Sequence, residues 1–244
     1  MKRISSKRTV FLKPARPALI GGLALLLAAH LAAAQSRPTV VELYTSEGCS
    51  SCPPAEAQIG RLAKQDDILA LAFHVQYWDE LGWRDRFGLP EAVLRQRQYA
   101  HTLRLPSIYT PQLVIDGQRD LVGGGTGIGS AGGRKPGVPL DVVIRGGNLV
   151  VTLPAQPPQA PCDVLLLGYL PEATSKVTRG ENAGRELHDF NIVRSVRNLG
   201  SWQGEPRTFS IPLSSMAPDA SAVAVLVQQR DQGAIVGAAS RTLR

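Results

Sequence analysis

The chain has 244 residues, of which 27 are lysine or arginine and 20 are aspartate or glutamate, so its formal net charge is +7. A basic protein suggests a nucleic-acid or membrane-surface partner, but six of the basic residues lie within residues 1–34, which hold no acidic residue. The other 210 residues keep 21 of the 27 basic residues and all 20 acidic ones, a net charge of +1, so we expect no nucleic-acid partner. A content of 43% hydrophobic and 19% charged residues excludes a disordered or multi-spanning protein.

Residues 1–34 have the pattern of a secretory signal peptide. A basic head, Met1–Arg16, leads into an apolar run, Ala18–Leu31, that ends at three alanines. The run is shorter than the roughly 20 apolar residues of a spanning helix, so we expect cleavage after Ala34 rather than retention as a membrane anchor. The mature protein is then expected in the periplasm or outside the cell, without a stable membrane span, where disulfides persist.

Strand-like and helix-like segments alternate over residues 38–122, which we expect to form a first domain. The order β-α-β-α-β-β predicts a small α/β sheet. In the second helix, Leu94 is expected to face inward and Arg95 and Arg97 outward. The expected strands are Val40–Tyr44, Ile68–Val75 (buried on both faces), Pro111–Ile115 and Arg119–Val122, and the expected helices are Ala55–Ala63 and Pro90–Leu103.

Residues 123–137 contain eight glycines and are expected to be a linker. Residues 138–244 then show strand after strand at roughly even spacing, which predicts a second, sandwich-like β domain. The expected strands are Leu140–Arg145, Leu149–Leu153, Asp163–Leu170, Phe190–Val196, Thr208–Leu213, Ala222–Gln229 and Ala234–Leu243.

The sharpest motif is the pair Cys49-Ser50-Ser51-Cys52, which follows an expected strand and precedes an expected helix. This is the arrangement of thiol–disulfide oxidoreductases. Two intervening residues allow a small disulfide ring, and the unpaired N–H groups and positive dipole of a helix start favour a thiolate. We expect Cys49 to be the exposed nucleophile and Cys52 to resolve the mixed disulfide.

Four further residues are candidates for substrate binding. Thr110 and Pro111 open the strand that, in thioredoxin-like folds, begins with a cis-proline against the cysteine pair, where they would hold a substrate backbone. His74 ends the expected central strand, where it is either a proton donor or acceptor for Cys49 or a buried, hydrogen-bonded residue. Trp78 belongs to an aromatic cluster that is either a packed loop or an apolar rim for a ligand.

Two other interpretations of the cysteine pair remain open. One is a structural disulfide in a non-catalytic binding protein, and the other is a thiolate site for a soft metal such as copper, with His74 nearby. A closed zinc site needs four ligands, and the sequence has no second Cys-x-x-Cys and no close histidine pair. For the oxidoreductase we expect no resident metal, and no organic cofactor, because the electrons pass through the disulfide itself. Cys162, the third cysteine, is either a buried small hydrophobic residue, a free thiol or a third redox partner, and we favour the first.

A polar, glycine-punctuated segment, Arg179–Arg185, either reaches over the cysteine pair or forms a solvated hairpin. With this segment, the motifs resemble a family of secreted bacterial proteins with a thioredoxin-like fold, classed as a domain of unknown function. The resemblance implies an α/β thioredoxin-like domain followed by a β-rich C-terminal domain. It covers roughly residues 38–243 and is carried by Val41–Ala55, Phe73–Trp83, Arg95–Tyr99, Tyr109–Gln112, Arg179–Arg185, Asn191–Val193 and Trp202.

The sequence therefore predicts an exported thiol–disulfide oxidoreductase that uses Cys49 and Cys52. Its partners would be protein thiols or disulfides of the periplasm. The sequence indicates neither the direction of the exchange nor the oligomeric state.

Overall fold

The structure is a computed structural model that describes residues 35–125, 133–157 and 159–243. The expected signal peptide, residues 1–34, lies outside the described residues, as do residues 126–132 of the expected linker. No helix in the described ranges is long and apolar enough to cross a membrane.

Strands make up 46% of the described residues and helices 14%. The helices are α1 (Pro53–Leu62) and α2 (Pro90–Thr102), with short 3-10 turns at Asp79–Leu81 and Leu213–Ser215. The strands are β1 (Gln35–Arg37), β2 (Thr39–Thr45), β3 (Ile68–His74), β4 (Gln112–Ile115), β5 (Arg119–Val122), β6 (Lys135–Gly137), β7 (Asp141–Arg145), β8 (Asn148–Leu153), β9 (Cys162–Lys176), β10 (Glu186–Trp202), β11 (Arg207–Pro212), β12 (Ala222–Gln229) and β13 (Ile235–Thr242).

One mixed sheet of eight strands joins both halves of the chain, in the order β13-β12-β9-β10-β3-β2-β4-β5. β2 and β3 are parallel and are connected through α1, whereas β4 and β5 form an antiparallel hairpin beside β2. β10 pairs in parallel with β3 at Ile192 and Ala72, which brings the C-terminal strands onto the same sheet. Two smaller sheets, β11-β8-β7 and β1-β6, complete the strand pairing.

The expected fold, an α/β thioredoxin-like domain followed by a sandwich-like β domain, is wrong. The described chain is mostly β, with only two α-helices, and its strands form large mixed sheets. Local patterns predicted the elements of residues 38–122 well, but they carry no signal for the pairing of β10 with β3. The last three residues of the expected linker, residues 123–137, form β6.

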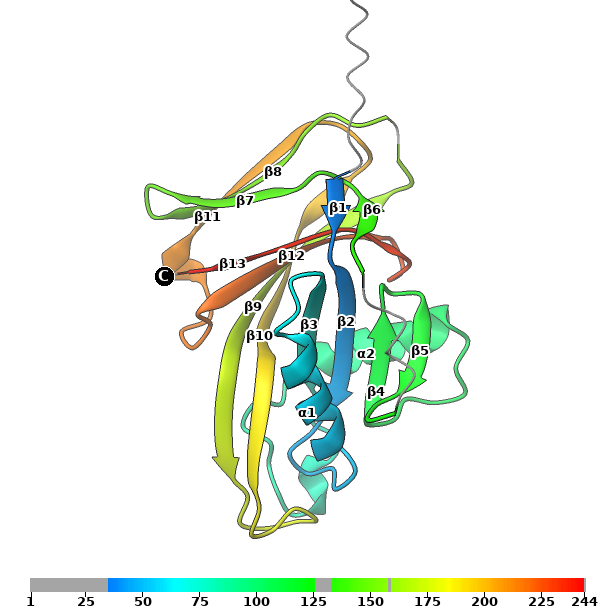
Figure 1. The fold of residues 1–244 in the computed structure, drawn as a ribbon, viewed down its shortest axis with the longest axis vertical. Coiled ribbons are helices and arrows are strands. Elements are labelled where there is room, and N and C mark those ends of the chain that lie inside the picture. Colours follow the sequence, from blue (N-terminus) through cyan, green and yellow to red (C-terminus); the bar gives the residue numbers. More distant parts are fainter. Residues whose placement is uncertain (1–34, 126–132, 158, 244) are drawn as a thin grey trace, which may run out of the picture. The chain divides into compact units, whose positions relative to one another are not determined.

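The two helices cover opposite faces of the centre of this sheet (Figure 1). β2 and β3 are buried along their whole length, as expected of strands packed on both faces. On one face, α1 packs Ala55 and Ile59 against alternate residues of these strands, and on the other α2 packs Ala92 and Tyr99. A third apolar cluster lies between β7-β8-β11 and strands β9 and β12.

The expected orientation of α2 is wrong at two residues. Leu94 is exposed, whereas Arg95 is buried. The guanidinium of Arg95 donates to both carboxylate oxygens of Glu42 on β2, at 2.9 and 2.6 Å, and to Gln228 on β12 at 2.8 Å. Tyr99 also donates to Glu42, at 3.2 Å. A buried ion pair thus joins α2 to the sheet where helical periodicity predicted a solvated charge.

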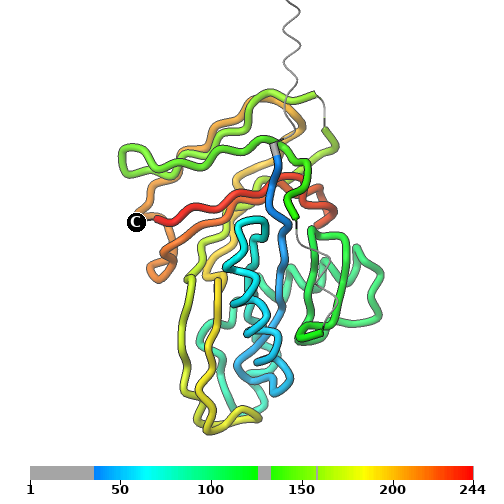
Figure 2. The backbone as a smooth tube through the Cα atoms, in the orientation of Figure 1, coloured from blue at the N-terminus to red at the C-terminus, as the bar shows by residue number. Residues whose placement is uncertain are grey.

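The hairpin of β9 and β10 extends far beyond its partners in the sheet. β9 has 15 residues and β10 has 17, longer than their expected spans. The tube in Figure 2 shows this hairpin running along β3 to the end of the molecule where β2 leads into α1. The segment between the two strands, 177–185, therefore reaches the loop that carries the cysteine pair.

Candidate functional site

The cysteine pair lies in the turn between β2 and α1, as the sequence predicts. Cys49 and Cys52 form a disulfide with a Cα–Cα distance of 5.4 Å. Cys52 is the N-cap residue of α1, and its carbonyl accepts hydrogen bonds from the N–H groups of Ala55 and Glu56 at 2.9 and 3.1 Å. Pro53 occupies the first helical position, where the missing N–H group costs no hydrogen bond. The disulfide is therefore held at the positive end of the helix dipole.

The expectation of an exposed Cys49 is wrong for the disulfide form. Cys49 is 0% exposed and Cys52 is 1% exposed. Segment 177–185 packs on the turn that carries the two cysteines. Asn182 is buried there and donates to the carbonyl oxygens of Glu47 and Cys49, at 2.9 and 3.0 Å. Of the two expectations for this segment, reaching over the cysteine pair is thus confirmed.

Glu181 adds a second connection between the same two segments. Its carboxylate accepts hydrogen bonds from the N–H group and hydroxyl of Ser50, at 3.2 and 2.7 Å. These bonds hold the pKa of the Glu181 carboxyl below its usual value. The Sγ of Cys49 also lies 3.4 Å from the hydroxyl of Ser51, within hydrogen-bonding distance for sulfur. The turn thus offers polar groups on both sides of the disulfide.

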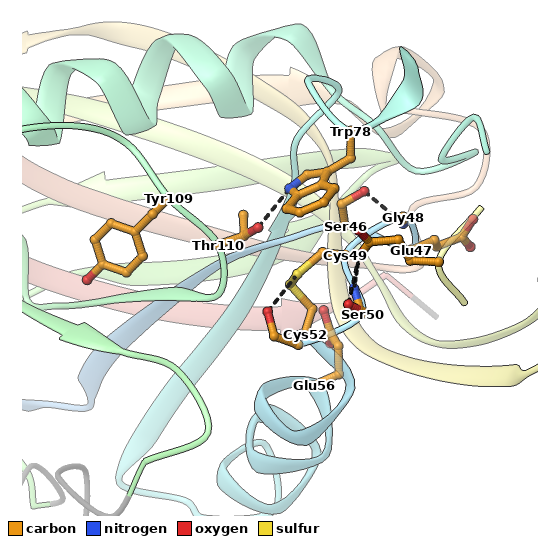
Figure 3. The surroundings of a disulfide bond; sticks show 12 residues. Ser46, Glu47, Gly48, Cys49, Ser50, Cys52, Glu56, Trp78, Tyr109 and Thr110 are labelled. Atoms are coloured by element: carbon orange, nitrogen blue, oxygen red, sulfur yellow. Dashed lines mark hydrogen bonds between the residues drawn. A yellow bond between two sulfur atoms is a disulfide. The ribbon is translucent and has the colours of Figure 1, made fainter. Parts of the chain in front are cut away.

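Two of the expected substrate-binding residues lie together beside the disulfide (Figure 3). The indole N–H of Trp78 donates to the hydroxyl of Thr110 at 2.8 Å. Gly48 fits closely against Trp78, because a Cβ at position 48 would lie 3.1 Å from the Trp78 Cβ. The Thr110–Pro111 peptide is cis, and the Pro111 ring packs against Gly123 close to Ala55 of α1.

His74 lies in a separate, buried acidic cluster. It is 0% exposed, and its Nδ1–H donates to Oδ2 of Asp85 at 2.7 Å. The backbone N–H groups of Glu47 and Phe87 donate to the Asp85 carboxylate at 2.9 and 2.8 Å and fix its position. The other ring nitrogen, Nε2, lies 3.8 Å from Oε1 of Glu56 on α1. The structure therefore places His74 among carboxylates and not among the residues around Trp78.

The pKa values of these groups are shifted, by burial for the two carboxylates Glu56 and Asp189 and by their mutual contact for His74 and Asp85. Burial raises the pKa of Glu56 to about 8 and that of Asp189, on β10, to about 6. Burial alone would lower the pKa of His74, but the carboxylate of Asp85 raises it to about 10. Burial would raise the pKa of Asp85, but His74 and the two backbone N–H groups hold it below its ordinary value.

Glu56 and Asp189 also line a cavity of about 370 Å³, together with Cys52 and Phe190. The cavity lies between α1 and the start of β10, which approach each other closely. A Cβ at Gly60 of α1 would lie 2.6 Å from the ring of Phe190, so this approach requires glycine. One side of the disulfide and the acidic cluster thus face the same space.

Cys162 takes no part in this site. It is 1% exposed, packs in the apolar cluster between β7-β8-β11 and β9, and its thiol donates to the carbonyl of Ala160 at 3.2 Å. Burial raises the pKa of this thiol. The expectation of a buried small hydrophobic residue is confirmed.

The sequence analysis missed the acidic members of the site. Glu56 follows Cys52 by one helical turn, a spacing that could have placed it below the cysteine pair. Asp85 lies in a loop and Asp189 in a long strand, and neither position has a local signal. They come together only through the pairing of β10 with β3.

Comparison with known proteins supplies the family. A model of the family described as "Protein of unknown function (DUF1223)" matches residues 40–228. Among solved structures, the chain is similar to the X-ray crystal structure of protein AGR_C_4864 from Agrobacterium tumefaciens, with 28% identity and a TM-score of 0.72. The match covers 86% of this chain and 96% of that one. No curated protein matches the chain. By the extent of the family match, the chain belongs to the DUF1223 family.

Proposed function

We propose that the protein is an exported thiol–disulfide oxidoreductase, in which Cys49 and Cys52 exchange their disulfide with thiols or disulfides of other proteins. The observation that carries this proposal is the disulfide at the N-terminus of α1, with Cys52 as the N-cap residue. A sulfur at this position is stabilised as a thiolate by the helix dipole, which makes it a good leaving group and a good nucleophile.

The exchange proceeds through a mixed disulfide. A substrate thiolate attacks Sγ of Cys49, the bond between Cys49 and Cys52 breaks, and its electron pair leaves on Cys52. A second substrate thiolate then attacks the substrate sulfur of the mixed disulfide and releases Cys49 as a thiolate. The substrate loses two electrons and the cysteine pair gains them. In the reverse direction, Cys49 attacks a substrate disulfide and Cys52 resolves the intermediate.

The surroundings of the disulfide support a protein substrate. Trp78 and Thr110 lie beside the cysteine pair (Figure 3), and the Trp78 ring, positioned by its hydrogen bond to Thr110, offers an aromatic surface to an approaching chain. Because both cysteines are buried, exchange requires a local opening of the turn, and segment 177–185, which is hydrogen-bonded to the turn, is the segment that we propose moves. No organic cofactor takes part, since the electrons pass between sulfur atoms.

Export is the second part of the proposal. Cleavage after Ala34 would leave β1, which begins at Gln35, intact. The first 34 residues would then be absent from protein recovered from the periplasm. Intact-mass measurement of that protein tests this, and recovery of the full 244-residue chain would contradict cleavage.

A redox titration tests the exchange chemistry. The protein is equilibrated in thiol buffers of graded potential, and the free thiols are alkylated and counted by mass. We expect a two-electron transition assigned to Cys49 and Cys52, present in Cys162→Ser and absent in Cys49→Ser. A pair that stays oxidised in every thiol buffer rules out the oxidoreductase. Trapping of mixed-disulfide partners with Cys52→Ser in the periplasm then identifies the substrates.

The burial of both cysteines favours a second candidate, a binding protein with a structural disulfide. In that case, Cys49→Ser lowers the melting temperature but has no effect on electron transfer to or from any protein thiol. The redox titration distinguishes the two, because a structural disulfide resists reduction by glutathione.

A further inference from the structure

We propose that Glu56, His74 and Asp189 bind a divalent transition-metal ion such as Zn²⁺ beside the disulfide. The three side chains come from α1, β3 and β10, and one ligand atom of each lies within 4.8 Å of the other two. They are 5%, 0% and 1% exposed, respectively. The proposed ligands include no cysteine, so this proposal does not rest on the proposed exchange chemistry.

The first argument is the absence of partners for the atoms that point into this cluster. Both carboxylate oxygens of Glu56, Nε2 of His74 and Oδ2 of Asp189 are buried without a hydrogen-bond partner. Such groups are rare in folded proteins because each loses its hydration without compensation. In the described part of the chain, no lysine or arginine forms an ion pair with Glu56 or Asp189. A bound cation supplies the missing partner to all three side chains at once.

The second argument is the orientation of the histidine. Metal-binding histidines characteristically donate their second ring N–H to a carboxylate, which fixes the ring and makes the free nitrogen more basic. Nδ1 of His74 donates to Asp85 at 2.7 Å, and the backbone N–H groups of Glu47 and Phe87 hold that carboxylate in place. Nε2 is therefore the nitrogen that faces Glu56, and it binds a metal when the metal displaces the proton on this nitrogen.

The spacing of the ligand atoms fits a metal ion after a small inward movement. Three atoms at most 4.8 Å apart lie at most about 2.8 Å from a common centre, and metal bonds to nitrogen and oxygen are roughly 2.0–2.2 Å long. Each atom therefore moves by at most about 0.6–0.8 Å. The distance of 3.8 Å between Nε2 of His74 and Oε1 of Glu56 is already close to the separation of two ligands on one ion.

The donor set selects the class of metal. One imidazole and two carboxylates suit Zn²⁺, Mn²⁺ or Fe²⁺, whereas Mg²⁺ and Ca²⁺ prefer oxygen alone and Cu⁺ prefers thiolates. Of the three, Zn²⁺ binds nitrogen and oxygen ligands most tightly. Three protein ligands leave a coordination position for water or for a ligand from the cavity that Glu56 and Asp189 line.

A titration of the oxidised, metal-free protein with Zn²⁺ against a chromophoric chelator tests the site. We expect the wild type to bind one Zn²⁺ per chain. The affinity for Zn²⁺ should fall by at least about tenfold in Glu56→Gln and in Asp189→Asn. Asp85→Asn keeps all three proposed ligands but removes the carboxylate that positions His74, and it should weaken Zn²⁺ binding by about 10–100-fold. The matched control is Glu186→Gln, because Glu186 is an exposed carboxylate on the same cavity. This variant keeps the wild-type affinity.

Thermal melts give a second measurement that does not depend on one variant. Zn²⁺ raises the melting temperature of the wild type and of Glu186→Gln, because it binds the folded state, and leaves that of Glu56→Gln and Asp189→Asn unchanged. Mg²⁺ at the same concentration has no such effect. The proposal is overturned if the oxidised wild type binds no stoichiometric Zn²⁺, if Mg²⁺ stabilises it equally, or if Glu186→Gln loses as much affinity as Glu56→Gln. Binding that is seen only after reduction, or is lost in Cys49→Ser/Cys52→Ser, assigns the metal to the thiolates and also overturns it.

Discussion

The side-chain N–H of Asn182 donates to the carbonyl oxygen of Cys49 at 3.0 Å, across a separation of more than half the chain. With the second bond from Asn182, to Glu47, this contact connects the tip of the β9–β10 hairpin to the turn that carries the disulfide. The turn that carries the cysteine pair is therefore held in part by a residue that lies far from it in the sequence.

Replacement of Asn182 by alanine should make the disulfide easier to reduce. The variant loses the two hydrogen bonds between segment 177–185 and the turn, each contributing about 1 kcal/mol, so the segment opens more often. We expect the rate of reduction by dithiothreitol to rise by up to about thirtyfold, which corresponds to about 2 kcal/mol. The rate is measured by quenching with an alkylating reagent and counting thiols by mass. Glu181→Gln should give a smaller increase, because Glu181 is exposed.

Arg179→Ala is the control for this experiment. Arg179 is exposed on the same segment, and no hydrogen bond connects its side chain to the turn among the described residues. Its rate of reduction should match that of the wild type. Equal rates for Asn182→Ala and the wild type would show that the segment does not limit access to the sulfur atoms.

The ion pair between Arg95 and Glu42 predicts a large loss of stability when one partner is removed. Arg95→Ala leaves the buried Glu42 carboxylate without its cation, which costs about 3–5 kcal/mol. Arg95→Lys keeps the charge but loses the two-point contact, so it should fall between the alanine variant and the wild type. Chemical unfolding measures the difference, with Arg97→Ala, an exposed residue of the same helix, as the neutral control. A loss below 1 kcal/mol for Arg95→Ala would contradict the assigned role.

The sequence predicted features that depend on neighbouring residues. The turn at Asp116 and Gly117, both with positive φ, joins β4 to β5 as an Asp-Gly pair predicts. The disulfide between Cys49 and Cys52 also follows from spacing and from the helix that comes after it. By contrast, helical periodicity assigned Arg95 to the solvent, because a pattern of charges cannot reveal that a buried carboxylate lies opposite on β2.

The sheet order and the acidic cluster depend on contacts between distant parts of the chain. β10 pairs with β3 at one register position, and no periodicity along either strand encodes that choice. Asp189 reaches His74 and Glu56 only because of this pairing. The sequence could therefore indicate the cysteine pair and its local surroundings, but not the carboxylates behind it.

Asp116 predicts a stability that depends on pH. Burial alone would raise its pKa, but hydrogen bonds from Lys135, Val40 and Arg37 hold the pKa below its ordinary value. A carboxyl group with a lowered pKa in the folded state stabilises the fold above its unfolded pKa of about 3.9, and this contribution is lost as the pH falls through the folded value.

Asp116→Asn should therefore be less stable than the wild type at pH 7, and the difference should shrink as the pH falls below about 4. Urea unfolding across this range measures it, with the exposed Asp66→Asn as the reference. If the two variants show the same pH dependence, Asp116 does not contribute in the way its contacts imply.

The contact between Gly60 and Phe190 predicts that Gly60→Ala changes the free energy of unfolding in opposite directions in the wild type and in Phe190→Ala. Alanine stabilises a helix interior by up to about 1 kcal/mol relative to glycine, but a Cβ at position 60 would lie 2.6 Å from the Phe190 ring. Overpacking of this kind costs about 1–3 kcal/mol, so Gly60→Ala should destabilise the wild type. In Phe190→Ala the ring is gone, and the same substitution should stabilise by about 0.5–1 kcal/mol. Chemical unfolding of the four proteins gives both values. If Gly60→Ala stabilised the wild type, α1 could move away from β10 to make room for the added methyl group. The distance between α1 and β10, and with it the size of the cavity beside Cys52, would then not be fixed by this contact.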